Sequence, residues 1–237
     1  QQVEDTPTVW VQLKTETGWK LQETGLPIRL ISDDIESVDV DRDGRVDLVV
    51  GSNTADWRKM VYFNREDGWE EQTSLGALSN TYHFDVEPVV RPDGTVEVYA
   101  AFMQFRMIGG ENNARTGLIR YEWTEDGLTA PDGAVYFDDD RTSTYFRVGV
   151  GDLNGDGLTD LVAGRKLGGL EVWIGIEDGG YLLEQSPEFG ELGRAFDIQL
   201  VDLNGDGRDD IIAAFAMVGE IPGGVGVWLT GGSDDDA

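Results

Sequence analysis

The chain has 237 residues, of which 40% are hydrophobic, so it can form one large domain with an ordinary core. Its 46 Asp and Glu residues outnumber the 18 Lys and Arg residues, and the formal net charge of -28 repels phosphate backbones and anionic lipids, which argues against nucleic-acid binding and membrane insertion. No cysteine is present to form disulfides, and no apolar run approaches the roughly 18 residues of a membrane-spanning helix.

Aromatic strands followed by tight turns recur along the chain. The first strand, VWVQL at Val9–Leu13, alternates apolar and polar residues and leads through Gly18 to a second strand at Trp19–Glu23. Similar segments follow: MVYFN before Gly68, LIRYEW before Gly127, EVWIG before Gly180, and a final VGVWL. No segment of useful length has a helical period, so every unit is predicted to consist of strands.

A nine-residue acidic segment follows the same repeat. It reads DVDRDGRVD at Asp39–Asp47, DLNGDGLTD at Asp152–Asp160 and DLNGDGRDD at Asp202–Asp210, and a short apolar run follows each copy. A fourth, degenerate copy lies at Val89–Glu97, where RPDG keeps the Asp-Gly pair. Four units of about 50–60 residues are therefore present.

Repeats of this length, made of about four short strands, are typical of β-propeller blades that stack radially about a central channel. We therefore predict an all-β fold with a single β-propeller domain over residues 1–230 and an acidic C-terminal tail at 231–237. The chain begins with the third and fourth strands of a unit and stops after a third strand. Four blades, five blades, and part of a larger ring that closes with a partner all remain open.

The acidic segments have the composition of a cation-binding loop. Acidic or amide side chains stand at positions 1, 3, 5 and 9, and glycine at position 6 permits the positive φ that a tight curl needs. Several carboxylates in a flexible loop suit Ca²⁺ better than Mg²⁺, and the backbone carbonyl at position 7 is expected as a further ligand. An EF-hand would need Glu at position 12, where Val50, Ala163 and Ala213 stand.

We predict three structural Ca²⁺ sites. Their ligands are Asp39, Asp41, Asp43, Arg45 and Asp47; Asp152, Asn154, Asp156, Leu158 and Asp160; and Asp202, Asn204, Asp206, Arg208 and Asp210. In the degenerate unit Val89 and Arg91 replace the ligands at positions 1 and 3, while Asp93, Gly94 and Glu97 keep the turn. The guanidinium of Arg91 is predicted to take the place of the ion, so no Ca²⁺ is expected there.

The pattern D-x-[DN]-x-D-G-x-x-D, followed by an apolar strand and repeated with an aromatic strand between, resembles the FG-GAP/VCBS repeat of integrin-type β-propellers. The resemblance extends from about Val9 to Leu229, although the phenylalanine-glycine signature is kept only near Phe196. It implies one Ca²⁺ per intact loop, between strands of a blade. It also implies an extracellular adhesion, carbohydrate-binding or accessory role, since only some members are enzymes.

Ligand-binding residues are expected at the mouth of the channel, on the segments that lead into the innermost strands. Counting back from the acidic segments places four stretches at equivalent positions: Ser32–Glu36, Tyr82–Phe84, Tyr145–Arg147 and Ala195–Asp197. The candidates taken from these stretches are Asp34, Tyr82, His83, Tyr145, Arg147 and Asp197. His83 is the only histidine, and its alternative to an acid-base role is that of a hydrogen-bonded structural residue.

Two long loops are predicted between paired strands, at Thr54–Lys59 and Gln104–Thr116. Trp57 lies in the first, off the repeat, and is the candidate for stacking on a sugar. The second carries Arg, Met and Asn side chains that can bind a sugar or a protein, and its alternative is a surface loop without a partner.

The function predicted from these features is a secreted or cell-surface calcium-binding propeller, or a periplasmic one, that binds a glycan or an extracellular protein. The rival from another class is a polysaccharide-degrading lyase or hydrolase with its site at the channel mouth. A structural part of a larger assembly, including a homo-oligomer, is the third alternative. The acidic, lysine-poor composition resembles that of proteins from salty habitats, where salt screens the repulsion between surface carboxylates.

Overall fold

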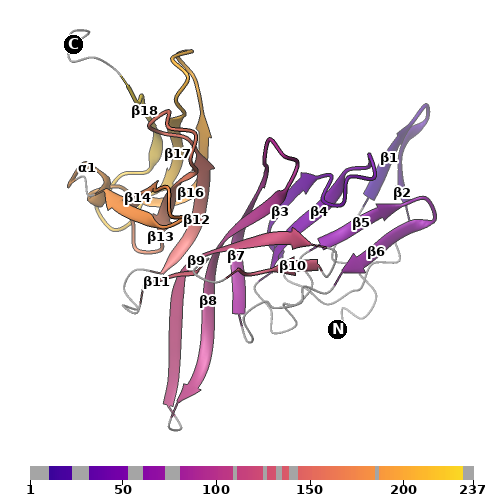
Figure 1. The fold of residues 1–237 in the computed structure, drawn as a ribbon, viewed down its shortest axis with the longest axis horizontal. Helices are drawn as coiled ribbons and strands as arrows, with labels where there is room; N and C mark the ends of the chain where they lie inside the picture. The colour runs from indigo at the N-terminus through magenta and orange to yellow at the C-terminus, as the bar shows by residue number, and fades with distance from the viewer. Residues whose placement is uncertain are drawn as a thin grey trace.

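Antiparallel β-sheets make up almost all of the described chain (Figure 1). The computed structural model describes residues 11–22, 32–52, 61–72, 81–108, 111–124, 127–131, 135–138, 144–184 and 187–231. Within these residues four sheets are propeller blades, and a fifth is the hairpin of β1 (Val11–Thr15) and β2 (Gly18–Gln22). The helix α1 is a single turn at Pro187–Gly190. The predicted all-β propeller is confirmed, and it has four blades.

Consecutive strands pair within each blade. Blade 1 contains β3 (Ser32–Val38), β4 (Asp47–Ser52), β5 (Val61–Arg65) and β6 (Gly68–Gln72). Blade 2 contains β7 (Thr81–Val90), β8 (Val96–Ile108), β9 (Glu111–Thr124) and β10 (Gly127–Thr129), and β11 (Val135–Asp138) also pairs with β9. Blade 3 contains β12 (Tyr145–Gly151), β13 (Asp160–Arg165), β14 (Leu170–Gly175) and β15 (Tyr181–Glu184). Blade 4 contains β16 (Arg194–Val201), β17 (Asp210–Ala216) and β18 (Gly224–Trp228).

The first strand of each blade lies next to the first strand of the following blade. β3 packs against β7, β7 against β12, and β12 against β16, so these four strands are the inner strands of the propeller. Each acidic segment of the sequence links an inner strand to the second strand of its blade. An inner strand therefore has the channel mouth at its beginning and, in blades 1, 3 and 4, an acidic loop at its end.

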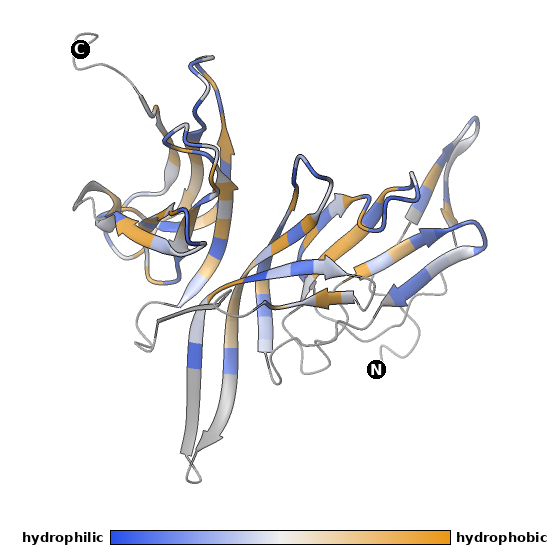
Figure 2. Cartoon of the chain, viewed as in Figure 1, coloured by the Kyte–Doolittle hydropathy of each residue, from blue (hydrophilic) through white to orange (hydrophobic). Residues whose placement is uncertain are grey.

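The hydrophobic core lies between the blades. One cluster joins blades 1 and 2 through side chains such as Val49 and Ile119, a second joins blades 2 and 3 through Ala101 and Leu161, and a third joins blades 3 and 4 through Val172 and Ile211. Apolar residues follow the strands rather than the turns (Figure 2). Because each buried aliphatic side chain contributes roughly 1.5–3 kcal/mol, packing between blades is the main source of stability.

The prediction of a long loop at Gln104–Thr116 is wrong. β8 and β9 pair without interruption as far as Ile108 and Glu111, and this hairpin projects beyond the rest of blade 2 (Figure 1). The polar side chains suggested a loop, whereas strand pairing depends on backbone hydrogen bonds that those side chains do not prevent. The predicted loop Thr54–Lys59, with Trp57, lies outside the described residues. No helix in the described ranges is long and apolar enough to cross a membrane.

Candidate functional site

The acidic loop of blade 3 curls around the carboxylate at its first position. Asp152 accepts hydrogen bonds from the backbone N–H groups of Gly155 at 2.7 Å, Asp156 at 3.2 Å and Gly157 at 2.8 Å. Asp156 in turn accepts one from Leu158 N at 2.7 Å. These bonds lie within the nine residues themselves, so the loop conformation is encoded locally. The loop of blade 4 repeats them at Asp202 and Asp206.

The glycine at position 6 adopts the conformation predicted for it. Gly44, Gly157 and Gly207 have φ angles of 86°, 81° and 86°. Side chains with a Cβ avoid this region, so glycine is required for the curl. Gly94 in the degenerate loop also has a φ of 86°, which shows that blade 2 keeps the turn without acidic residues at positions 1 and 3.

The carboxylates at position 9 are fully buried and join the loop to the blade. Asp160 is 0% exposed and accepts hydrogen bonds from Leu153 N in the loop and from Gly175 N at the end of β14, both at 2.8 Å. Asp47 and Asp210 make the equivalent pairs of bonds. Burial raises the pKa of Asp160, and the two N–H donors act in the opposite direction. The residue at position 9, which the sequence predicts as a Ca²⁺ ligand, therefore also acts as a clamp that joins the loop to the strands of its blade.

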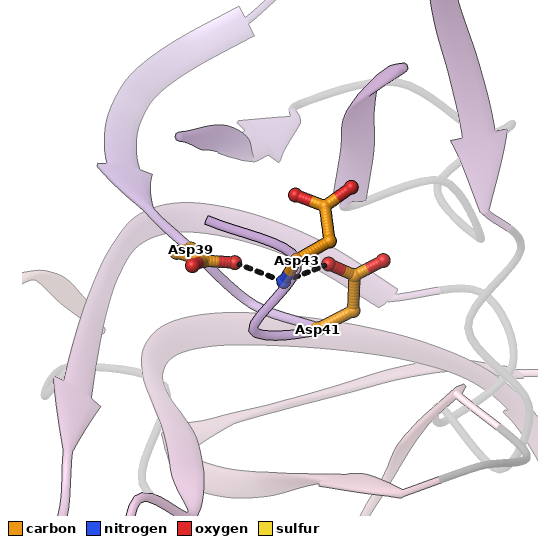
Figure 3. Close-up of side chains that lie close together, drawn as sticks. All are labelled: Asp39, Asp41 and Asp43. Atoms are coloured by element: carbon orange, nitrogen blue, oxygen red, sulfur yellow. Dashed lines mark hydrogen bonds between the residues drawn. The ribbon is translucent and has the colours of Figure 1, made fainter. Parts of the chain in front are cut away.

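The loop of blade 1 gathers three carboxylates at one point (Figure 3). One oxygen each from Asp39, Asp41 and Asp43 lies within 4.8 Å of the others, and Asp43 N donates to both neighbours. Several carboxylate oxygens held this close suit a hard cation. The side chain of Arg65 in β5 also reaches Asp41 and Asp43, so part of the negative charge is already compensated.

In the degenerate loop Arg91 binds the carboxylate at position 9. Its Nε donates to Glu97 Oε2 at 2.6 Å, and its Nη2 donates to the hydroxyl of Tyr99 at 3.0 Å. Glu97 is buried, and Arg120 contributes a second guanidinium 3.5 Å from its other oxygen. A positive side chain thus lies where the other loops offer negative ones, as the sequence predicted. The absence of Ca²⁺ from this loop stays a prediction.

At the opposite end, every inner strand contains a β-bulge at the same place. The pairing of each inner strand with its neighbour skips one residue, and these residues are Asp33, Phe84, Phe146 and Phe196. A bulge redirects side chains at the edge of a sheet and recurs beside binding sites. Three of the four bulged residues are phenylalanines, and the rings of Phe84 and Phe146 are stacked with centroids 4.3 Å apart.

In blades 1 to 3 the residue after the bulge connects one blade to the next. Asp34 accepts a hydrogen bond from Val86 N in blade 2 at 2.9 Å, and Asp85 accepts one from Val148 N in blade 3 at 2.7 Å. Blade 3 has Arg147 at this position, and its Nε donates to the carbonyl of Phe196 in blade 4 at 2.6 Å. The same backbone position therefore carries a carboxylate in three blades, as Asp34, Asp85 and Asp197, and a guanidinium in blade 3.

All four bulged residues line one pocket of about 210 Å³ at the channel mouth. The remaining lining residues are Arg147, Arg194 and Ala195. The guanidinium of Arg194 lies 4.9 Å from the centre of the Phe196 ring, and Lys166 Nζ lies 5.4 Å from the centre of the Phe146 ring. The pocket thus combines aromatic faces with positive charge on a strongly acidic protein.

Two carboxyl groups on the inner strand β7 have raised pKa values. Burial, and after it the charge of Asp34, raise the pKa of Asp85 to about 8, although Arg147 at 3.4 Å opposes the shift. Burial also raises the pKa of Glu87 to about 8, with contributions from the charges of Glu36, Asp34 and Asp197. The inner strand β7 therefore carries two carboxyl groups that are partly protonated near neutral pH.

The structure brings only some of the predicted ligand-binding residues to the pocket. Arg147 lines it, Asp34 joins two blades, and Asp197 is exposed on blade 4. Tyr145 is buried, and its hydroxyl donates to Glu171. Tyr82 is partly buried in β7 and does not line the pocket.

His83 is buried in the blade rather than at the mouth. It is 0% exposed, its Nε2 lies 2.7 Å from the hydroxyl of Tyr121, and burial lowers its pKa to about 4. It is thus a neutral, hydrogen-bonded residue at pH 7. The bulged residues beside the predicted candidates were not singled out. A signal for them is present in the sequence. When the four units are aligned, the position directly before Asp34, Asp85, Arg147 and Asp197 holds phenylalanine in three of them.

Residues 152–213 match the family model described as an FG-GAP-like repeat. The match begins at the acidic loop of blade 3 and ends in β17, after the acidic loop of blade 4. No curated protein matches the chain in sequence. The matched repeat and the arrangement of four blades together support an FG-GAP/VCBS-type β-propeller.

Proposed function

We propose that the protein is a ligand-binding module that uses the pocket at the channel mouth. The observation that supports this is the convergence of one bulged residue from each of the four blades on a single pocket. Aromatic rings together with guanidinium groups at a mouth fit a binding site, because such sites combine apolar faces with a few placed polar groups. By the resemblance of the chain, the ligand is a glycan or an extracellular protein, and the location is secreted, cell-surface or periplasmic.

The acidic loops are proposed to bind Ca²⁺ as structural ions, as FG-GAP repeats often do. The gathered oxygens of Asp39, Asp41 and Asp43 support this for blade 1. In blades 3 and 4 the support comes from the loop conformation. Hydrogen bonds within each loop hold its backbone in a tight turn, which carries carboxylate and amide oxygens at equivalent positions. The ions would then tie each loop to its blade at the end of the inner strand that lies away from the pocket.

A glycan array combined with pull-down from extracellular protein, with and without Ca²⁺, tests the binding function. We expect capture of a ligand that the Phe146→Ala variant loses while it keeps the wild-type melting temperature within a few degrees. Trp19→Ala, at an aromatic residue of the hairpin strand β2 that is 67% exposed and outside the pocket lining, is the matched control and should keep binding. Capture of no glycan and no protein under either condition would leave the proposal without support.

A polysaccharide-degrading activity has less support from the geometry. The chain has one histidine, and His83 is buried against Tyr121 rather than presented in the pocket. Acid-base chemistry at the mouth would have to use carboxyl groups such as Asp85 or Glu87, whose raised pKa values suit proton transfer near neutral pH. Release of reducing ends from acidic or neutral polysaccharides, measured for the wild type and for Asp85→Asn, tests this alternative.

Assembly with a second copy is a second candidate function, and the outer face of blade 4 favours it. Val225 and Val227 in β18 are 73% and 53% exposed, and the strand register places Ala214 and Ile212 of β17 on the same face. The equivalent residues of blade 3, such as Val172, are buried against blade 4. Blade 4 therefore exposes an apolar sheet face that is equivalent to the face of blade 3 buried against blade 4.

Sedimentation or light scattering at rising salt tests this assembly, because salt screens the repulsion between two chains of charge -28. We expect a concentration-dependent dimer that Val227→Lys abolishes. Leu183→Lys, at an exposed apolar residue of blade 3, serves as the control. A monomer at every concentration and salt level would refute the assembly.

A further inference from the structure

The pocket at the channel mouth contains a guanidinium that is held in place by the backbone of three blades. Arg147 Nε donates to the carbonyl of Phe196, and its Nη1 donates to the carbonyls of Phe84 at 3.1 Å and Phe146 at 2.8 Å. None of these bonds uses Nη2. A guanidinium oriented in this way loses little entropy when its remaining N–H groups bind a planar anionic group such as a carboxylate.

A second guanidinium lines the same pocket without a partner of opposite charge. Among the residues that the structure describes, no carboxylate forms an ion pair with Arg194, which lies over the ring of Phe196. The chain has 46 acidic residues and 18 basic ones, so an arginine without an acidic ion-pair partner is unusual. The acid nearest to Arg147 compensates its charge only in part, because the raised pKa of Asp85, about 8, keeps much of it protonated at pH 7.

The rest of the pocket suits a small ring. Phe196, which is 50% exposed, and Phe146 supply apolar surface against which the C–H face of a sugar can pack, whereas Phe84 is 4% exposed and stacks on Phe146. Asp33 is the one carboxylate residue among the described residues of the lining. The volume of about 210 Å³ is smaller than the roughly 300–1,000 Å³ of pockets that hold drug-sized ligands. It therefore suits one ring rather than a length of polysaccharide.

We propose that this pocket binds a single carboxylate-bearing sugar unit, with the carboxylate on Arg147 and Arg194 and the ring against the phenylalanines. The inference rests on the proposed binding function and adds to it the charge and size of the ligand. Recognition through two arginines is electrostatic in part, so the affinity falls as salt is raised.

Calorimetric or NMR titration of the whole chain with matched monosaccharides tests the inference. The probes are glucuronate and galacturonate, glucose and galactose as neutral counterparts, and glucose 6-sulfate as an anion without a carboxylate. We expect the two sugar acids to bind at least about tenfold more tightly than their neutral counterparts, because a charge-assisted bidentate contact contributes more than 1.4 kcal/mol. Tighter binding of the sulfate than of both acids would refute the carboxylate.

Two variants locate the contact. Arg194→Ala should weaken glucuronate binding by at least about tenfold at an unchanged melting temperature, since the side chain makes no described ion pair. Arg194→Lys keeps the charge but loses the fork of donors, so it should bind with intermediate affinity. Lys20→Ala removes a positive charge from the exposed hairpin strand β2 and should bind like the wild type. Equal binding by wild type and Arg194→Ala would overturn the inference.

The outcomes also separate this inference from the broader function. If neutral sugars bind as tightly as the acids, and Phe146→Ala abolishes both, the binding module stands and the anionic ligand is refuted. If a protein is captured through the pocket while no sugar binds, the module again stands and the sugar acid is refuted. If neither any glycan nor any protein is bound, both are refuted.

Discussion

The two ends of the inner strands differ in what the blades share there. At one end the acidic loops of blades 3 and 4 share DLNGDG, the same hydrogen bonds and a buried carboxylate at position 9. At the other end the four blades share a β-bulge, but one blade departs from the other three at each position: Asp33 stands where the other blades have Phe, and Arg147 where the other blades have Asp. Residues that recur in each blade maintain the structure of that blade. Residues that differ between blades at equivalent backbone positions can together form a single binding site. Stability is therefore expected to depend on the loops and binding on the bulges.

The largest effect should come from removing a position 9 carboxylate. Asp160→Ala leaves the N–H groups of Leu153 and Gly175 buried without their acceptor, which should lower the free energy of unfolding by roughly 2–6 kcal/mol at about 1–3 kcal/mol per group. Urea unfolding measures the change, and Glu184→Ala, at an exposed residue, is the control. A loss below about 1 kcal/mol would contradict the clamp between loop and blade.

Removal of Ca²⁺ should come next. An ion present at 100 times its dissociation constant stabilises a folded protein by about 2.7 kcal/mol, which for a chain of this size corresponds to roughly 5–10 °C in melting temperature. We therefore expect excess chelator to lower the melting temperature by several degrees and Ca²⁺, rather than Mg²⁺, to restore it. If the chelator leaves the melting curve unchanged, none of the three loops binds a stabilising Ca²⁺ ion.

The degenerate loop of blade 2 should respond to a side chain rather than to an ion. Arg91→Gln removes the main partner of the buried Glu97, while Arg120 and Tyr99 remain, so a loss of roughly 1–3 kcal/mol is expected. The shift in melting temperature caused by chelator should be the same in this variant as in the wild type. A larger chelator effect in the wild type than in Arg91→Gln would indicate an ion in this loop after all.

The smallest effect concerns the pH dependence of stability. The pKa of Glu87 is about 8 in the folded protein and about 4.3 in an unfolded chain, so the folded state binds the proton more tightly. The resulting stability is complete below the unfolded pKa and is lost as the pH rises toward and through 8. Glu87→Gln should therefore lose less melting temperature than the wild type between pH 5 and pH 8. An equal loss in both proteins would exclude Glu87 as a source of the dependence.

Much of the architecture could be predicted because its signals are local. Asp152, Gly157 and Asp160 lie within nine residues, and the hydrogen bonds that shape their loop follow from that spacing. The repeat then indicated the number of units, and strand alternation indicated their composition. The same local reasoning failed at Gln104–Thr116, where polar side chains suggested a loop although the two strands pair without interruption. It also placed His83 at the channel mouth, whereas the side chain is buried within the blade.

The sequence by itself determined the acidic loops, the glycines that curl them and the all-β blades, because these depend on contacts between residues close together in the chain. Only the tertiary structure decided the pocket. A bulge is set by the register between two strands, and Asp33, Phe84, Phe146 and Phe196 come together from inner strands about 50 residues apart. Their meeting depends on how the blades pack around the channel, which no short stretch of the chain specifies.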